Sequence, residues 1–247
     1  GLALTAFSTA AAAAAWMFRR GREPRLAVSY LYSAVLFSGL SLLVAVRAGF
    51  LPDGVDRDWT TPIFALHAVA VLVAAYRLRS PVAAWLGSGL VLATSLHALR
   101  WNVSIGDFFQ SRGLQIADPI VVAVLVHGAV VMLVAVVVRV RRRGIGEGES
   151  ADDNRVLTGV VESLCATGLL SSGLVLPATL YVTEQSFATH AIYAFWTAAV
   201  WTLAAFLMRS WLLFSTAQVL TTIGAGLACT AVCQRQSWWG DGYWDPR

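Results

Sequence analysis

Charged residues are scarce in this sequence, and lysine is absent altogether. Aspartate, glutamate, lysine and arginine together make up 13% of the 247 residues, whereas a soluble domain carries about 25%. All 18 basic residues are arginines, and they stand at the ends of apolar runs rather than together on one solvated face. This distribution argues against a nucleic-acid-binding surface in spite of the net charge of +4.

The sequence also lacks the motifs of the common enzyme classes. It has no Walker loop, no HExxH zinc motif, no GxSxG elbow and no CxxC pair. Glycines 144, 146 and 148 form a GxGxG pattern that follows arginines and runs into acidic residues, which favours a flexible connector over a phosphate-binding loop. Three cysteines cannot form a fully paired disulfide framework. We therefore expect a protein that is not an enzyme, with no catalytic residues, no metal and no cofactor.

Long apolar segments are what the sequence has in abundance. The clearest runs from Pro119 to Val138 without a formal charge, and twenty helical residues rise about 30 Å, which matches the hydrocarbon core of a bilayer. Arg139 and three further arginines follow at once, and the positive-inside rule assigns them to the cytoplasmic side. One membrane span is thereby predicted together with its direction.

Eight such segments predict an all-α polytopic membrane protein of four helical hairpins, with both ends of the chain outside. The predicted spans are residues 2–18, 26–46, 62–76, 81–98, 119–138, 156–180, 187–208 and 211–233. The first span is the weakest, because it consists largely of alanine, which is only marginally apolar. Pro177 is expected to kink or end the sixth helix, and residues 139–155 are expected to form a flexible cytoplasmic loop. We expect residues 1–247 to be a single transmembrane domain and, since the chain does not begin with methionine, a segment of a longer protein.

The distribution of arginine supports this orientation in the membrane. Twelve arginines fall on the predicted cytoplasmic side and six on the outer side. The cytoplasmic set is arginines 19, 20, 22, 25, 77, 79, 139, 141, 142, 143, 155 and 209, and the outer set is 47, 57, 100, 112, 235 and 247. The arginine turns recur every 58 to 70 residues. A repeated hairpin unit would give this period, and so would alternating spans without any duplication.

Four histidines are candidate functional residues within or beside the spans. His67, His97, His127 and His190 fall on four different predicted helices, all in the outer half of the membrane. Two of them brought together would form a haem or metal site or a proton relay. Because no two share one helix at a fixed spacing, interhelical hydrogen bonding by neutral imidazoles is the favoured role.

Glu162 is the only formally charged residue well inside a predicted span. A carboxylate that faces lipid at that depth would cost a few kcal/mol, so we expect Glu162 to face the bundle or to be protonated. One interpretation is a proton- or cation-binding step in transport. The other is a shallow glutamate that water reaches and that pairs with an arginine of a cytoplasmic turn.

Small and aromatic residues inside the spans predict how the helices meet. Small residues allow close helix–helix approach, which replaces the hydrophobic effect as the packing force in lipid. The pairs are Gly87 with Gly89, Gly168 with Ser172, and Gly224 with Gly226. Trp196 and Trp201 lie inside a span, where they would line a cavity or fill the space beside small neighbours.

Spans that are punctuated by arginine turns and end in a tryptophan-rich cap, as in RSWLLFSTAQVLTTIGAGLACTAVCQRQSWW (residues 209–239), resemble a group of bacterial proteins. These are the very long, uncharacterised predicted membrane proteins built from many consecutive transmembrane helical hairpins. The resemblance is clearest over residues 187–247 and implies an architecture rather than an activity. Together with the arginine count, it leads us to expect a place in the bacterial cytoplasmic (inner) membrane.

Two functions follow as expectations. The first is a non-enzymatic integral membrane module that anchors, scaffolds or assembles. Its partners would be the lipid bilayer and other membrane protein chains or further helices of the same chain, with no nucleic acid. The alternative is a transporter or channel component with a proton- or cation-linked step at Glu162.

Overall fold

The computed structural model describes residues 2–21, 24–50, 57–112, 118–144, 151–181 and 186–236, and within these ranges it is helical with no strand. The helices are α1 (Leu2–Arg20), α2 (Pro24–Phe50), α3 (Arg57–Arg77), α4 (Pro81–Arg100), α5 (Val103–Ser111), α6 (Pro119–Gly144), α7 (Ala151–Tyr181), α8 (Phe187–Met208) and α9 (Trp211–Cys233). Eight of these described helices are long and apolar enough to cross a membrane. The predicted all-α polytopic fold is confirmed, and the chain is an integral membrane protein.

Several helix boundaries differ from those expected. Residues 139–144 complete α6 and residues 151–155 begin α7, so helix extends into both ends of the segment expected to be a loop. α7 does not end at Pro177 but continues to Tyr181, and residues 99–118, which the predicted spans leave as a loop on the outer side, contain α5. The predicted spans stopped where charged or helix-breaking residues appear. A helix continues past charged residues because its backbone hydrogen bonds do not depend on apolar side chains, and it can continue past a proline because the ring removes only one of those bonds.

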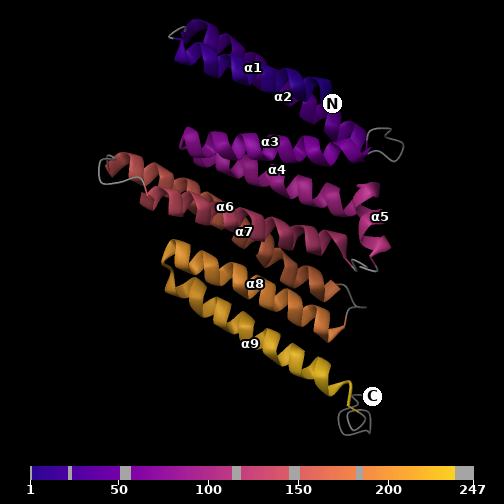
Figure 1. Ribbon diagram of the computed structural model, residues 1–247. Coiled ribbons are helices and arrows are strands. Elements are labelled where there is room, and N and C mark those ends of the chain that lie inside the picture. The colour runs from indigo at the N-terminus through magenta and orange to yellow at the C-terminus, as the bar shows by residue number, and fades with distance from the viewer. Residues whose placement is uncertain are drawn as a thin grey trace.

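The helices stand in a row of four antiparallel hairpins, α1/α2, α3/α4, α6/α7 and α8/α9, which follow one another in chain order (Figure 1). In all four hairpins the first helix ends and the second begins at the same end of the helices (Figure 1), beside Arg20, Arg77, Arg139 and Arg209, and we call this the arginine end. Neighbouring hairpins meet through the last helix of one and the first helix of the next, α2 with α3, α4 with α6 and α7 with α8. Each junction of this kind therefore pairs two antiparallel helices.

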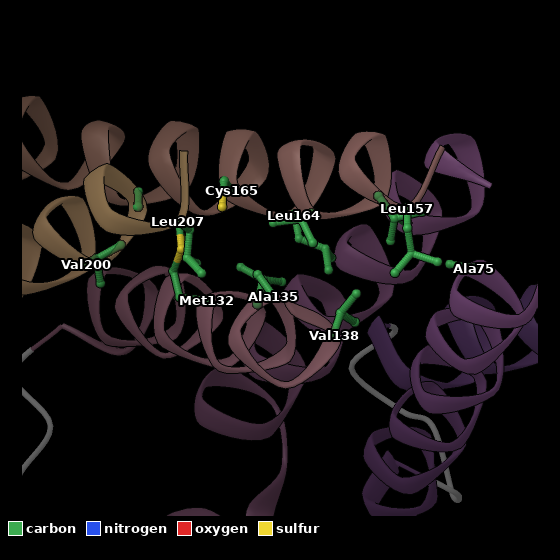
Figure 2. Close-up of a cluster of buried hydrophobic side chains, with 14 residues drawn as sticks. Ala75, Met132, Ala135, Val138, Leu157, Leu164, Cys165, Val200 and Leu207 are labelled. Carbon is green, nitrogen blue, oxygen red and sulfur yellow. The ribbon is translucent and has the colours of Figure 1, made fainter. Parts of the chain in front are cut away.

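The largest buried cluster lies where α3, α4, α6, α7 and α8 meet. Met132 and Ala135 of α6 and Leu164 and Cys165 of α7 lie between these two helices, and Leu207 of α8 lies beside Met132 (Figure 2). Lipid tails are as apolar as these side chains, so dense packing rather than the removal of apolar surface from water holds the helices together.

Glycine allows α6 and α7 to approach closely. A methyl group at Gly168 would lie 2.8 Å from Met132 Cε and 3.2 Å from Val131 Cγ2. One at Gly128 would lie 3.5 Å from the carbonyl oxygen of Gly168. The small residues predicted to permit close helix contact do so at this junction.

Burial decreases towards both ends of the row. In α7 and α8 the buried share of the spanning residues is 56% and 50%, whereas in α1, α2 and α9 it is 17%. Within the first hairpin, hydroxyl groups join α1 to α2, with Thr5 Oγ1 2.6 Å from Ser41 Oγ and Ser8 Oγ 2.6 Å from Ser38 Oγ. The faces of α1 and α9 that point away from their hairpin partners carry many exposed residues.

Candidate functional site

Three polar side chains from three helices meet in the middle of the row. Ser88 of α4, His127 of α6 and Thr167 of α7 are all buried. Ser88 Oγ lies 2.9 Å from His127 Nε2 and 2.8 Å from Thr167 Oγ1. The same imidazole nitrogen lies 3.1 Å from the Ser88 carbonyl oxygen. We call these residues the central polar cluster, and they tie the α3/α4 hairpin to the α6/α7 hairpin.

The partners of His127 define which of its nitrogens carries the proton. Thr167 donates its hydroxyl proton to the Leu164 carbonyl, and Ser88 donates to Thr167. Both Ser88 oxygens are therefore acceptors towards the imidazole, so Nε2 of His127 carries the proton that serves them. Nδ1 is buried without a hydrogen-bond partner, and because an unpaired N–H of a charged ring is costly in that position, this nitrogen carries no proton. His127 is thus neutral and held in one tautomer.

This geometry suits a histidine that bridges helices better than one that binds a metal or relays protons. Nε2 is committed to Ser88, and Nδ1 has no polar neighbour with which to exchange a proton. In the part of the chain that the structure describes, no group of three or more His, Cys, Asp and Glu side chains gathers where it could hold a metal ion. Interhelical hydrogen bonding is the chemistry that the central polar cluster supports.

A second set of polar contacts lies at the end of the helices opposite the arginine end. His97 of α4 is fully buried, with Nε2 3.2 Å from the Gly49 carbonyl of α2 and Nδ1 2.8 Å from Thr61 Oγ1 of α3. Because a carbonyl only accepts, Nε2 donates to Gly49, and Thr61 donates its hydroxyl proton to Nδ1. The Asn102 amide in turn donates to Thr61 Oγ1 at 2.9 Å. We call Gly49, Thr61, His97 and Asn102 the outer polar chain, and it joins α2, α3 and α4.

Asn102 and Asp58 hold α5 against the start of α3. Asn102 caps α5 by accepting from the Ile105 amide at 2.9 Å. Its side-chain amide also donates to the Asp58 carbonyl at 3.2 Å, the carbonyl that Pro62 leaves without a helical donor. The Asp58 carboxylate accepts from the first backbone N–H of α5 at 3.0 Å and from the Ser104 hydroxyl. A proline inside α3 is accommodated because the side-chain amide of Asn102 replaces the hydrogen bond that the proline cannot donate.

The other two histidines bond to their own helices. His67 Nδ1 lies 2.8 Å from the Ile63 carbonyl oxygen, and His190 Nδ1 lies 3.0 Å from the Ser186 carbonyl oxygen. In each case the carbonyl belongs to the residue one helical turn earlier. The four histidines therefore stand on four helices, as expected, each with its own set of partners.

Glu162 does not face the bundle, which was one of the two alternatives expected for it; protonation of its carboxyl group, the other, stays a prediction. Its side chain is exposed on α7, about 7.5 Å along the helix from Leu157, where the spanning segment begins. Glu162 and Thr167 are five residues apart, which places them about 140° apart around the helix axis. The carboxylate therefore points away from the central polar cluster, because the inward positions of α7 are taken by the residues that pack on α4 and α6.

The sequence pointed to the histidines but not to their partners. Ser88, Thr167 and Thr61 are hydroxyl residues in apolar helices, and such residues commonly bond only to their own backbone, as Thr94 does. No local pattern distinguishes the two kinds. Asn102 had a usable signal, because an asparagine directly before an apolar run is a helix N-cap, and it would have indicated α5.

The tryptophans of α8 make contacts of the same structural kind. The indole N–H groups of Trp196 and Trp201 donate to the Leu125 carbonyl at 3.2 Å and to the Ser172 hydroxyl at 3.0 Å. Trp201 lies against a small neighbour, 3.7 Å from the methyl position of Gly173, as one of the two interpretations expected, whereas Trp196 is 43% exposed. The hydrogen bonds of the described residues thus hold helices in register with one another.

No protein-family model, no curated protein and no solved structure matches this chain.

Proposed function

We propose that this chain is a non-enzymatic module of the bacterial cytoplasmic membrane that scaffolds an assembly of membrane-spanning helices. Its arginine end faces the cytoplasm and both ends of the chain lie outside, in line with the two-to-one arginine bias. The observation that carries the proposal is the uneven burial of the row. The middle helices are packed on several sides, whereas α1, α2 and α9 bury only 17% of their spanning residues.

The buried polar groups support a structural role. The central polar cluster and the outer polar chain each join helices of different hairpins. An unpaired polar group in hydrocarbon costs several kcal/mol, so such groups favour one arrangement of helices over others. Their protons are committed to fixed partners, which suits a scaffold better than a site that binds and releases a substrate.

The uncovered end faces support assembly with further helices. α9 exposes Gln218, Thr222 and Gly226 within its spanning segment, and α1 exposes a row of alanines. Small and polar residues promote helix–helix association in lipid, and lipid itself offers them no hydrogen bonds. We infer that other helices cover one or both ends of the row.

Recovery of the chain from membranes in native lipid nanodiscs tests this proposal. The expected result is that a second polypeptide, either another copy or a different chain, is recovered with it in a fixed ratio by native mass spectrometry. If the chain is recovered alone from membranes in which it is present at its native level, the proposed scaffold function is contradicted.

Reconstitution into liposomes tests the transport alternative. We expect proton and cation flux no higher than that of empty liposomes, and no effect of Glu162→Gln, because Glu162 points away from the buried polar groups. Flux that exceeds the empty control and disappears in Glu162→Gln would favour a transporter with a coupled step at this residue.

A further inference from the structure

The α3/α4 and α8/α9 hairpins have the same turn, 130 positions apart in the sequence. In the described ranges, Arg79 and Arg209 are the only non-glycine residues with a left-handed backbone, with φ of 53° and 52°. Each precedes a serine that caps the next helix, Ser80 with φ −101° and ψ 112° and Ser210 with φ −103° and ψ 114°. Both serine amides donate to the carbonyl five residues earlier, at 2.9 and 3.1 Å. The two turns therefore correspond residue by residue, and they align α4 with α9 at an offset of 130 positions.

The correspondence continues along the face that each second helix turns towards its hairpin partner. A methyl group at Gly87 of α4 would lie 2.8 Å from the Leu72 side chain of α3. The corresponding residue of α9 is Ala217, which is buried. One turn or two further on, α9 also buries Leu220 and Gly224. Both hairpins thus close through the same side of their second helix.

α4 has a second buried face, and here the two hairpins differ. The buried residues of this face are Ala84, Ser88, Val91 and Ser95, and α4 contacts the following α6/α7 hairpin. The corresponding residues of α9 are Phe214, Gln218, Thr221 and Ala225, and all four are exposed. α9 thus presents the face on which a following hairpin stacks, and no described part of the chain covers it.

The side chains of this face suit a closely packed helix. Gln218 takes the place of Ser88, which bonds to two side chains of the next hairpin. It lies about 10 Å from the start of α9, at a depth where lipid offers its amide no hydrogen bonds. Thr222 and Gly226 follow at intervals of one turn, about 40° and 80° around the helix from Gln218, so they border this face on its side away from α8. A methyl group at Gly226 would meet nothing within 4 Å. We call Gln218, Thr222 and Gly226 the α9 docking face.

The existing junctions indicate which helix fits there. Three junctions between hairpins join a last helix to the first helix of the next hairpin in antiparallel fashion. In a second copy with the same membrane orientation, α1 is the helix that continues this pattern. The side of α1 opposite its contacts with α2 is a row of small exposed residues, Ala3, Ala6, Ala10 and Ala13. Such a row lets a neighbouring helix approach closely, so that the backbone carbonyls of α1 come within reach of the Gln218 side-chain amide.

We propose that the α9 docking face of one copy packs against the alanine row of α1 in a second copy, so that copies join head to tail. This inference rests on the proposed scaffold function and names its partner. A heterologous contact of this kind forms a closed ring or an open array, according to the angle between successive copies.

Disulfide trapping between two differently tagged copies tests the pairing. Ala10 and Thr222 each lie about 15 Å from the arginine end of their helices. In a chain whose three native cysteines are replaced by alanine, Ala10→Cys and Thr222→Cys copies co-expressed in membranes are expected to form a mixed disulfide on oxidation. Gly89→Cys in place of Thr222→Cys is the matched control, because Gly89 is also exposed with nothing within 4 Å of its methyl position. It is expected to give only the background yield.

A second pair of variants tests the packing itself. Gly226→Leu, added to the Thr222→Cys copy, is expected to abolish the mixed disulfide, whereas Gly89→Leu leaves it intact. All variants are compared for an unchanged thermal transition, so that a lost cross-link reports on docking rather than on folding.

The outcomes separate this inference from the proposed function. A disulfide between two Thr222→Cys copies without the mixed product would overturn α1 as the occupant. Failure to cross-link while a different chain is recovered in nanodiscs would overturn the pairing and leave the scaffold standing. A chain that is recovered alone and does not cross-link would overturn both.

Discussion

At position 49 the neighbouring helices leave room for a hydrogen atom and little else. A methyl group on Gly49 would collide with the Thr60 side chain and lie 2.9 Å from His97 Nε2. The Gly49 carbonyl also accepts the hydrogen bond of that same nitrogen. The close contact of α2 with α3 and the outer polar chain therefore depend on one residue.

Gly49→Ala is expected to destabilise the protein by about 1–3 kcal/mol, the usual cost of overpacking, seen as a lower unfolding midpoint in nanodiscs. Gly39→Ala on the same helix is the matched control, because nothing lies within 4 Å of its methyl position. Alanine also has the higher helix propensity, so this control is expected to leave stability unchanged or slightly raised. Equal losses in the two variants would contradict the close contact at Gly49.

His127 and Ser88 are expected to be energetically coupled. A double-mutant cycle with His127→Ala and Ser88→Ala measures the interaction that joins α6 to α4. Hydrogen bonds between membrane helices average about 0.6 kcal/mol and reach about 1.7 kcal/mol, and this buried pair is expected at the upper end. The control cycle pairs Ser88→Ala with Thr202→Ala, which removes a hydroxyl bonded to its own helix on α8. Coupling no larger than in the control would contradict the bridge.

Among the described elements, α5 is the one whose existence depends most directly on its neighbours. It has nine residues, too few for an isolated helix to be stable in water. Asn102 and Asp58 occupy its start, and Arg112 lies over the Phe108 ring at its end, 3.8 Å from the centroid. Its position is set by α3 and α4. Asp58 belongs to the start of α3, and Asn102, which follows α4 closely in the chain, donates hydrogen bonds to the start of α3.

Asn102→Ala is expected to release α5 from α3. The change removes the helix cap, worth about 1 kcal/mol, and the donors to Thr61 and the Asp58 carbonyl. Amide hydrogen exchange measured by mass spectrometry should become faster in α5 and in the first turns of α3, with α6 and α7 unchanged. Ser111→Ala at the other end of α5 removes only a local contact with the Phe108 carbonyl and serves as the control. Protection of α5 that survives Asn102→Ala would show that the capping asparagine does not hold it.

For the molecule as a whole, the orientation in the membrane is expected to follow the arginines. Gly148 and Gly240 lie outside the described residues, in the predicted cytoplasmic loop and the predicted outer tail. In a cysteine-free chain, an impermeant maleimide is expected to label Gly240→Cys in intact cells and Gly148→Cys only after permeabilisation. The bilayer blocks the reagent from the cytoplasmic side. Labelling of Gly148→Cys in intact cells would reverse the topology.

The row of hairpins also bears on the question of internal repetition. The regular recurrence of arginine left open whether the hairpins are repeated units or simply alternating spans. The identical turns at Arg79 and Arg209 favour a shared unit for two of the four hairpins. The sequence concealed this similarity because lipid-facing positions tolerate many apolar residues, whereas the turn needs a left-handed residue followed by a helix cap.

The order of apolar and charged residues along the chain was enough to determine the number of spans and their pairing into hairpins. Both depend on local properties, the length of each apolar run and the charge that follows it. The same reasoning located the four histidines on four helices. It misjudged helix ends such as residues 139–144, because hydropathy marks the edge of the bilayer rather than the end of the helix.

Tertiary structure decided which face of each helix meets another. In water an apolar face points inward, but in a bilayer lipid is as apolar as a neighbouring helix, so hydropathy does not distinguish the two. Glu162 is therefore exposed rather than turned towards the bundle, the first of its two expected alternatives, and Ser88 became the partner of both His127 and Thr167 without any sequence signal. Close packing and the pairing of buried polar groups select these contacts, and both depend on residues far apart in the chain.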